Sequence, residues 1–456
     1  MMEPLKSDLI IIGAGPGGYE TALAAAKAGL QVTLFNGDRL GGTCLNEGCI
    51  PTKCLCRNAE VVSTVKEGDL FGLDNLRYEL DYNKVLERKN SVVSTLRDGI
   101  AFMLKQTKVN VVEAKASFKD EHVVEADGNL YTADNIIIAT GSVSRSLPIP
   151  GADLECVMDS TDILDIDYVP ESLTIIGGGV IGMEFASIFS SLGSQVTVIE
   201  FMKQILPPFD SDIAKRLKQA LSKKGIKIIT SAAAKRIEQD EAYRPVVHYE
   251  CKGKEDSVTS TNLLMAVGRS PRLDGLNLEA AGVEFSPKGI VVNDEMRTNK
   301  PHIYAIGDVN GRMMLAHVAS FQGQRALNHI LGKRDEIRFD LVPSAVFTLP
   351  ECGMVGKTEE ECKAAGEEIM IGQSFFRSNG KSLAMNEPDG VVKLIFRKSD
   401  GLMLGAHIMG VEAADLAQQC CNLMNRKVTL EEMRQIIFSH PSVSEVLMTA
   451  LHSIKG

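Results

Sequence analysis

Runs of consecutive apolar residues, each followed by a glycine-rich segment and then a helical pattern, occur twice in the sequence. The first run is Leu9-Ile10-Ile11-Ile12, and an alanine-rich stretch begins at Tyr19. The second run is Leu173-Thr174-Ile175-Ile176, and its helical stretch begins at Met183. Short apolar runs bounded by turn residues are typical of buried strands. The pattern therefore predicts a strand–turn–helix–strand unit over residues 9–35 and a second over residues 173–200.

Both turns carry glycines at the spacing GxGxxG. A missing Cβ permits a tight turn and a close approach of the backbone to a pyrophosphate, which then faces the helix N-terminus. One such motif would also suit a plain connection between a strand and a helix, but two copies in the same context predict that two dinucleotides bind. The residues of the two sites are Gly13, Gly15 and Gly18 in the first copy, and Gly177, Gly179, Val180, Ile181 and Gly182 in the second.

The second strand of each unit ends in a different residue. Glu200 ends the strand of the second unit, 18 residues after Gly182. A carboxylate here accepts hydrogen bonds from a ribose 2′-hydroxyl and repels a 2′-phosphate, which favours NAD over NADP. In the first unit Asn36 stands where an acid is expected. Its amide can still bind ribose hydroxyls, with a possible contribution from Asp38, but the sequence does not explain the replacement.

The rest of the pattern defines the other domains. Apolar runs at residues 135–141 and 263–269 end in small-residue turns and are expected to close the two nucleotide-binding units. After Pro343 strands such as 391–396 alternate with amphipathic helices, and the glycine-rich turns stop. We therefore predict an α/β fold with two Rossmann-like domains and a C-terminal α+β domain. A Pro- and Gly-rich linker at residues 147–151 marks the first crossing, and the expected boundaries are 1–147 with 275–342 for the first domain, 148–274 for the second and 343–456 for the third.

Composition narrows the function classes. A length of 456 residues suits about three domains, and 44% apolar with 24% charged residues is ordinary for a globular protein. A net charge of −10 argues against a nucleic-acid partner, since such binding needs a basic surface. No apolar stretch reaches the roughly 18 residues that span a membrane. The N-terminus resembles neither a secretory nor a transit signal, so we expect a cytoplasmic protein.

A close pair of cysteines follows the first unit, within the segment 41–53. Thr43 is a plausible N-cap that would place Cys44 in the first turn of a helix, where the helix dipole stabilises a thiolate. Cys49 lies five residues further on, and Gly48 and Pro51 could bend the backbone enough for the two sulfurs to bond. A disulfide that closes so small a loop adds little stability, so reversible exchange is its expected use.

Two other interpretations of this pair stay open on the residues alone. The cysteines could simply be buried, as free cysteines often are. Cys54 and Cys56 could join them in a four-cysteine metal site, but the spacing lacks the paired CxxC arrangement of zinc sites. Packing within a helix suits Cys54 and Cys56 better, and the histidines show no ligand spacing either, so no metal is predicted.

Taken together, the segment GGTCLNEGCIPTK, the two GxGxxG units and the tail His440-Pro441-Ser442-Val443-Ser444-Glu445 resemble the class I pyridine nucleotide–disulfide oxidoreductases. The resemblance runs nearly from end to end and includes residues 298–308, 314–317 and 347–351. It implies FAD in the first domain, NAD in the second and a homodimer formed through the third. Besides the glycines and Asn36, the residues that it implies for FAD are Gly42, Thr43, Lys53, Ala116, Thr140, Gly141, Asp308, Met314, Leu315, Ala316 and His317, and it adds Gly268 for NAD.

The resemblance also assigns catalytic roles. Ser442-x-x-Glu445 on its own is a capping box that opens the last helix. In the family, however, the residue matching His440 is the acid–base, Glu445 orients it, and the partner subunit supplies both. Cys44 and Cys49 are the redox pair. Lys53 is expected to pair with Glu184 beside the flavin, although Glu184 could also be an ordinary acid of a helix's first turn.

Within the family the sequence is most similar to the enzymes that oxidise dihydrolipoyl groups with NAD⁺. The expected partners are lipoyl domains or a lipoyl carrier protein of a 2-oxo acid dehydrogenase or glycine cleavage complex. A glutathione-type reductase should carry basic residues in place of Glu200. A mercuric reductase should end in a vicinal cysteine pair, whereas Cys420-Cys421 lies 35 residues before the end. The remaining alternative is a non-catalytic subunit of such a complex.

Overall fold

The computed structural model describes residues 3–455 and builds them around three main sheets. The first sheet has the order β3-β2-β1-β6-β5-β4, with β19 paired to β6. Its central pairs are parallel, and Leu9, Ile10 and Ile11 of β1 have no exposed surface. The strands are β1 (Leu5–Ile12), β2 (Val32–Phe35), β3 (Asn110–Val112), β4 (Ser117–Phe118), β5 (Val123–Ala126), β6 (Asn129–Ile138) and β19 (Ile303–Ala305). The unit predicted over residues 9–35 is confirmed, with α1 (Pro16–Lys27) as its helix.

The second sheet repeats this arrangement. It is parallel throughout, in the order β11-β10-β9-β15-β8, and the unit predicted over residues 173–200 is confirmed. Its elements are β8 (Val157–Met158), β9 (Ser172–Ile176), α5 (Val180–Leu192), β10 (Gln195–Glu200), α6 (Ser211–Lys223), β11 (Lys227–Thr230) and β15 (Asn262–Met265). An antiparallel sheet of β12 (Ala232–Gln239), β13 (Pro245–Cys251) and β14 (Lys254–Thr259) adjoins it.

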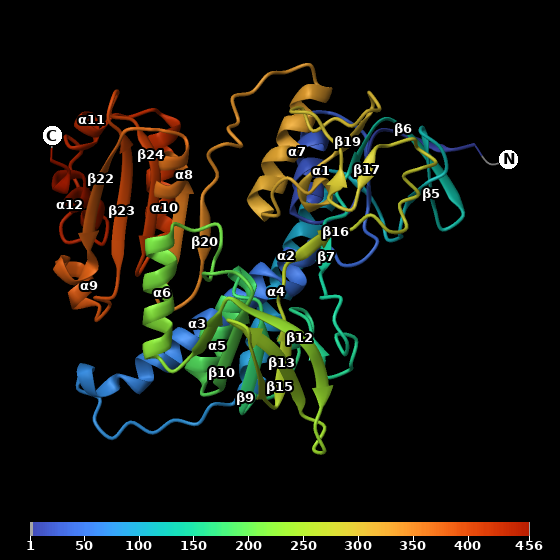
Figure 1. The fold of residues 1–456 in the computed structure, drawn as a ribbon. Helices are drawn as coiled ribbons and strands as arrows, with labels where there is room; N and C mark the ends of the chain where they lie inside the picture. Colours follow the sequence, from blue (N-terminus) through green and yellow to red (C-terminus); the bar gives the residue numbers. More distant parts are fainter. Residues whose placement is uncertain (1–2, 456) are drawn as a thin grey trace.

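The chain passes between the two units through one small ladder. β7 (Ser142–Ser144) leaves the first sheet, and β16 (Arg269–Pro271) pairs with it in the antiparallel direction when the chain returns. The returning chain then forms β17 (Phe285–Ser286), β18 (Gly289–Ile290), β19 and α7 (Ala316–Ile330), which lies beside α1 (Figure 1). The predicted domain boundaries fit this path and stay a prediction.

Three helices connect the first unit to the rest of the molecule. α2 (Gly42–Glu47) and α3 (Cys49–Lys66) meet at Gly48, and α3 packs against both α4 (Tyr82–Gln106) and α5. One helical segment that follows the first nucleotide turn thus reaches the second nucleotide-binding unit. No helix within residues 3–455 has the length and apolar character of a membrane span.

The C-terminal domain is an antiparallel sheet covered by helices, at the end of the molecule opposite β5 (Figure 1). The predicted strand 391–396 is β23, and the predicted amphipathic helices include α10, along which Ala414, Ala417, Cys421 and Met424 recur at helical spacing. The elements are β20 (Ser344–Val346), β21 (Cys352–Gly356), α8 (Glu359–Ala364), β22 (Ile369–Phe375), α9 (Gly380–Ala384), β23 (Val391–Arg397), β24 (Met403–Met409), α10 (Ala413–Asn425), α11 (Leu430–Met433) and α12 (Glu445–Ser453).

A buried ion network joins the second nucleotide-binding unit to the C-terminal domain. Lys393 of β23 lies 2.9 Å from Asp210, which precedes α6, and 2.6 Å from Glu359 of α8. Burial alone would raise the pKa of Asp210, but hydrogen bonds from Lys393 and the Glu359 backbone outweigh it and hold that pKa below its usual 3.8. Burial alone would lower the pKa of Lys393, and its bonds to the two carboxylates raise it instead. The three groups therefore stay ionised at neutral pH.

Replacing Lys393 with methionine leaves two buried carboxylates without their cation. We expect the variant to lose about 3 kcal/mol of unfolding free energy at pH 7, measured by urea denaturation. Lys398→Met is the matched control, because Lys398 is exposed and its pair with Glu368 is long, at 3.8 Å, and the variant should lose at most about 0.5 kcal/mol of unfolding free energy.

The ion network should also make stability depend on pH. The folded-state pKa of Asp210 is depressed, so its contribution to stability is present above the unfolded-state pKa and is lost as the pH falls through the folded-state pKa. The difference between wild type and Lys393→Met should therefore shrink as the pH falls, first because the carboxylates of the variant, buried without their cation, take up protons, and then because wild-type Asp210 does; an unchanged difference at low pH would contradict the assignment.

Candidate active site

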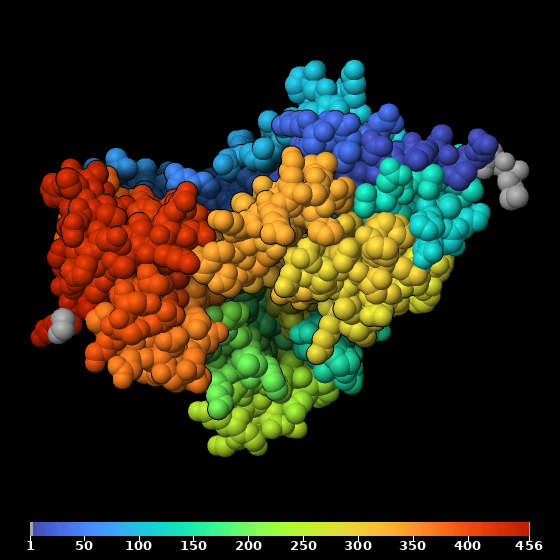
Figure 2. Space-filling model, turned by 90° about the horizontal axis from the view of Figure 1, so that it is seen from above, coloured from blue at the N-terminus to red at the C-terminus, as the bar shows by residue number. Residues whose placement is uncertain are grey.

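One large cavity brings together the two glycine-rich turns and the cysteine pair. Its volume is 2130 Å³, which is more than one drug-sized ligand fills. Its wall comes from both nucleotide-binding units and, in the C-terminal domain, from the segment around β20 and from α10. The surface is hollowed where the orange segment around α7 faces the green second unit (Figure 2). The cavity can therefore hold two elongated ligands that meet at the cysteines.

The two turns have the same backbone geometry. Gly13 and Gly177 have φ values of +113° and +115°, and a Cβ on either would lie 2.2–2.3 Å from a carbonyl oxygen of the neighbouring strand end. Gly18 and Gly182 do not line the cavity; each packs against the carbonyl of its own turn, where a Cβ would come within 2.0 Å. No side chain caps α1 or α5, so the N–H groups at each helix start remain available to a phosphate. The residues present therefore fit two dinucleotides.

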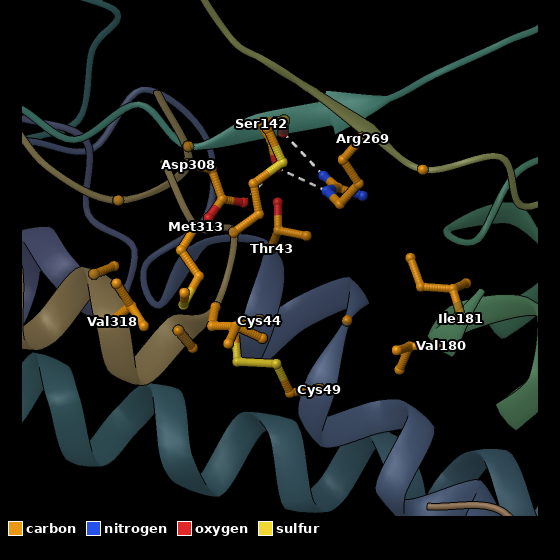
Figure 3. Close-up of a pocket in the computed structure, with 18 of the residues that line it drawn as sticks. Thr43, Cys44, Cys49, Ser142, Val180, Ile181, Arg269, Asp308, Met313 and Val318 are labelled. Carbon is orange, nitrogen blue, oxygen red and sulfur yellow. Dashed lines mark hydrogen bonds between the residues drawn. A yellow bond between two sulfur atoms is a disulfide. The ribbon is translucent and has the colours of Figure 1, made fainter. Parts of the chain in front are cut away.

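Cys44 and Cys49 form a disulfide at the corner between α2 and α3 (Figure 3). Their Cα atoms lie 4.7 Å apart, and the break at Gly48 brings them together, as predicted. The predicted N-cap was wrong. Gly41, at φ +93°, caps α2, and Thr43 lies inside the helix with its hydroxyl 3.4 Å from a Glu47 carboxylate oxygen. A glycine cap suits this position because the left-handed backbone excludes most side chains.

Residues of the two nucleotide-binding units lie on either side of this disulfide. In Figure 3, Asp308 and Met313 are on one side, and Val180 and Ile181 are on the other. The other cysteines of the described chain are unbridged, and Cys54 and Cys56 are buried in α3, as expected of packing residues. The disulfide thus stands where the first site meets the second.

Lys53 and Glu184 form the predicted pair. The Lys53 ammonium donates to both carboxylate oxygens of Glu184 at 2.9 Å, and it also lies 4.7 Å from the centre of the Phe347 ring. Glu184 is only 3% exposed, and its Oε1 accepts a third bond from the Phe347 backbone N–H at 3.0 Å. The pair joins α3, α5 and the C-terminal domain next to the disulfide.

A second polar network was missed by the sequence analysis. The Ser142 hydroxyl donates to Asp308 at 2.5 Å, and Arg269 Nε donates to the same hydroxyl at 2.7 Å (Figure 3). Burial raises the pKa of Asp308, while the Ser142 hydrogen bond and the Arg269 charge oppose this. Ser142 and Arg269 each follow a glycine that was singled out, Gly141 and Gly268. The turn at the end of each closing strand was therefore the signal that could have revealed them.

The remaining predicted nucleotide residues are placed as follows. Glu200 is buried, and its two carboxylate oxygens accept from the backbone N–H groups of Gly178 and Met202, the latter at 2.6 Å. Burial lowers the pKa of His317, whose Nε2 lies 3.0 Å from the Pro343 carbonyl. The predicted residues that line the cavity are Gly13, Gly15, Asn36, Gly42, Thr43, Lys53, Ala116, Thr140, Gly141, Gly177, Gly179, Val180, Ile181, Glu184, Glu200, Gly268, Asp308, Met314, Leu315, Ala316 and His317.

His440 and Glu445 form a pair outside this cavity. His440 Nδ1 lies 3.0 Å from Glu445 Oε1, and Glu445 Oε2 accepts from the Ser442 backbone N–H at 2.9 Å. The capping-box interpretation was half right: α12 begins at Glu445 with Ser444 as its cap, so Ser442 does not cap it with its side chain. The His440 side chain is 81% exposed, and neither His440 nor Glu445 lines the cavity. A single chain therefore does not bring His440 to Cys44.

Comparison with known proteins identifies the family. The pyridine nucleotide-disulphide oxidoreductase model matches residues 7–323, and the dimerisation domain of the same family matches residues 342–451. The chain belongs to the pyridine nucleotide-disulphide oxidoreductase family, whose cofactors are FAD and a pyridine nucleotide. The predicted fold class and family are confirmed.

Two relatives and one solved structure show the similarity within the family. A dihydrolipoyl dehydrogenase of Bacillus subtilis is 39% identical over 98% of both chains, and one of Haloferax volcanii is 38% identical over 99% of this chain and 96% of its own. Among solved structures, the HOCl-induced flavoprotein disulfide reductase RclA from Escherichia coli is 31% identical, with a TM-score of 0.88 over 98% of this chain and 100% of its own.

Proposed function

We propose that the protein oxidises dihydrolipoyl groups to the cyclic disulfide and reduces NAD⁺, with FAD as resident cofactor. The observation that carries the proposal is the Cys44–Cys49 disulfide, which lines the same cavity as the two glycine-rich turns that fit dinucleotides. The similarity to dihydrolipoyl dehydrogenases along nearly the whole chain supports the substrate class. The vicinal Cys420 and Cys421 are buried in α10, which does not suit the mercuric alternative.

The chemistry at the cysteines is a pair of thiol–disulfide exchanges. His440 takes the proton of one substrate thiol, and the resulting thiolate attacks Cys44, so that Cys49 leaves as a thiolate. The second substrate sulfur then attacks the first substrate sulfur, which is now bonded to Cys44. The cyclic disulfide departs, and His440 returns the first proton to the leaving Cys44 sulfur and takes up the proton of the second substrate thiol, while Cys49 remains a thiolate. The substrate has lost two electrons, and the cysteine pair has gained them.

Glu445 positions His440 for these proton transfers. Because Glu445 Oε1 holds Nδ1 at 3.0 Å, Nε2 is left as the nitrogen that exchanges protons with the substrate. Since the pair lies outside its own cavity, it serves the cavity of a second subunit, and the dimerisation domain at residues 342–451 supports this arrangement. A symmetric dimer then has two complete sites.

When bound, FAD supplies the transfer of two electrons from the cysteine pair to the pyridine nucleotide. The first glycine turn would hold its pyrophosphate, Asp308 would bind its ribityl chain, and Lys53, fixed by Glu184, would supply a positive charge to the flavin site. The second turn and Glu200 would hold NAD. Lipoyl domains or a lipoyl carrier protein are the proposed partners. Unbridged cysteines elsewhere in the described chain fit a reducing cytoplasm.

A steady-state assay tests this function. The flavin-loaded protein should reduce lipoamide with NADH at least about 100-fold better, in kcat/KM, than with NADPH, because the Glu200 carboxylate repels a 2′-phosphate. It should leave glutathione disulfide unreduced. Preference for NADPH, or turnover of glutathione disulfide instead of lipoamide, would favour a glutathione-type reductase. No turnover of lipoamide with flavin bound would favour a non-catalytic subunit.

A further inference from the structure

Asn36, at the position where an acid is expected, is hydrogen-bonded to Glu113 of the neighbouring strand end. Asn36 Nδ2 donates to Glu113 Oε2 at 2.6 Å. β2 and β3 are parallel, with Phe35 opposite Val112, and the Asn36 N–H donates to the Val112 carbonyl at 2.8 Å. The next residues of the two strands are thus neighbours at the carboxyl edge of the first sheet. The register itself, and not a chance surface contact, places the acid beside the amide.

The hydrogen bond to Glu113 fixes the direction of the Asn36 amide. A carboxylate has only acceptor atoms, so the amide NH₂ group must face Glu113 and Oδ1 must face away. Asn36 is 6% exposed and lines the cavity, whereas Glu113 is exposed and lies outside the cavity lining. Within residues 3–455, Oδ1 accepts no hydrogen bond from the protein. Asn36 therefore brings to the cavity lining an oriented acceptor that the protein leaves free for a hydroxyl donor.

We propose that Asn36 and Glu113 together replace the single acid that binds the adenosine ribose of FAD. Asn36 supplies the acceptor, and Glu113 is a positioning residue that orients the amide and supplies the negative charge. A hydrogen bond from an amide to a carboxylate also polarises the amide, which makes Oδ1 a stronger acceptor. The inference rests on the proposed binding of FAD at the first glycine turn.

In this arrangement, restoring the usual acid at position 36 should weaken FAD binding. Asn36→Asp introduces the acid usually expected at this position, but it sets two carboxylates at hydrogen-bond distance, where like charges repel. Glu113→Gln in the same chain supplies an NH₂ donor from the other side and rebuilds the pair in reverse. An independent surface acid at Glu113 would show no such dependence between the two positions.

The test measures FAD binding to the deflavinated protein at pH 8, and the quenching of flavin fluorescence reports the binding. The expected dissociation constants are about tenfold higher for Glu113→Gln and at least about tenfold higher for Asn36→Asp. The double variant should return to within about threefold of wild type. Glu125→Gln is the matched control and should bind as wild type does, because Glu125 is an acid of the same sheet that pairs with Lys119 and not with Asn36.

FMN lacks the adenosine ribose and serves as the second probe. Its affinity should be the same for all the variants, which also shows that the rest of the flavin site is folded. The inference is overturned if Glu113→Gln matches Glu125→Gln, if Asn36→Asp alone binds FAD as well as wild type, or if FMN weakens in parallel with FAD. Failure of the wild-type protein to bind FAD would instead refute the proposed function, and the inference with it.

Discussion

Replacing Cys44 with serine is expected to lower lipoamide turnover by more than about 10³-fold, because the substrate thiolate then has no disulfide sulfur to attack. The disulfide joins the first turn of α2 to the first residue of α3, and its two cysteines are only five positions apart. Its loss should therefore change stability little. The measurement is the steady-state rate with dihydrolipoamide and NAD⁺ on protein whose flavin absorbance equals that of wild type.

Cys156→Ser is the matched control for this variant. Cys156 is a partly exposed, unbridged cysteine outside the cavity lining, so its variant should keep wild-type activity. Cys49→Ser should be as inactive as Cys44→Ser, since either change removes the disulfide. An active Cys44→Ser protein with a full complement of flavin would mean that the substrate bypasses the cysteines, and the proposed mechanism would be wrong.

The elements around the two nucleotide sites could be predicted because local rules agree there. In β1 every residue from Leu9 to Ile12 is apolar because the strand is covered on both faces, and Gly18 is required by a backbone contact with Gly13 of the same turn. Pattern and spacing alone therefore located both strand–turn–helix units. The cysteine pair was visible for the same reason, since its members are only five positions apart.

Contacts across the fold were not visible in this way. Ser142 and Arg269 are 127 positions apart and meet only because β7 and β16 pair when the chain returns to the first sheet. Asn36 and Glu113 are 77 positions apart, and their contact depends on the register of β2 with β3. A resemblance to a family assigns roles to single matching positions. It could flag Asn36 as a departure, but it could not identify the residue that accompanies it.

Replacing His440 with glutamine should lower lipoamide turnover by about 10²- to 10⁴-fold, because the substrate thiol loses its general base while the disulfide remains. The side chain is exposed, so the variant should fold and keep its flavin. Glu445→Gln should have a smaller effect, since it weakens the orientation of His440 without removing the base. His452→Gln, an exposed histidine on α12, is the matched control and should be active. Wild-type turnover by His440→Gln would show that another group is the base.

Mixed dimers of these inactive proteins test which subunit supplies the base. A dimer of one Cys44→Ser chain and one His440→Gln chain contains, in the proposed arrangement, one site with both Cys44 and His440 intact and one site with neither. Refolding the two variants together at equal amounts should therefore recover about one quarter of wild-type turnover, since half of the dimers are mixed and each has one working site. If each chain used its own histidine, no mixed dimer would contain a complete site and the mixture would stay inactive. The exposed position of His440, outside the cavity of its own chain, favours the first result.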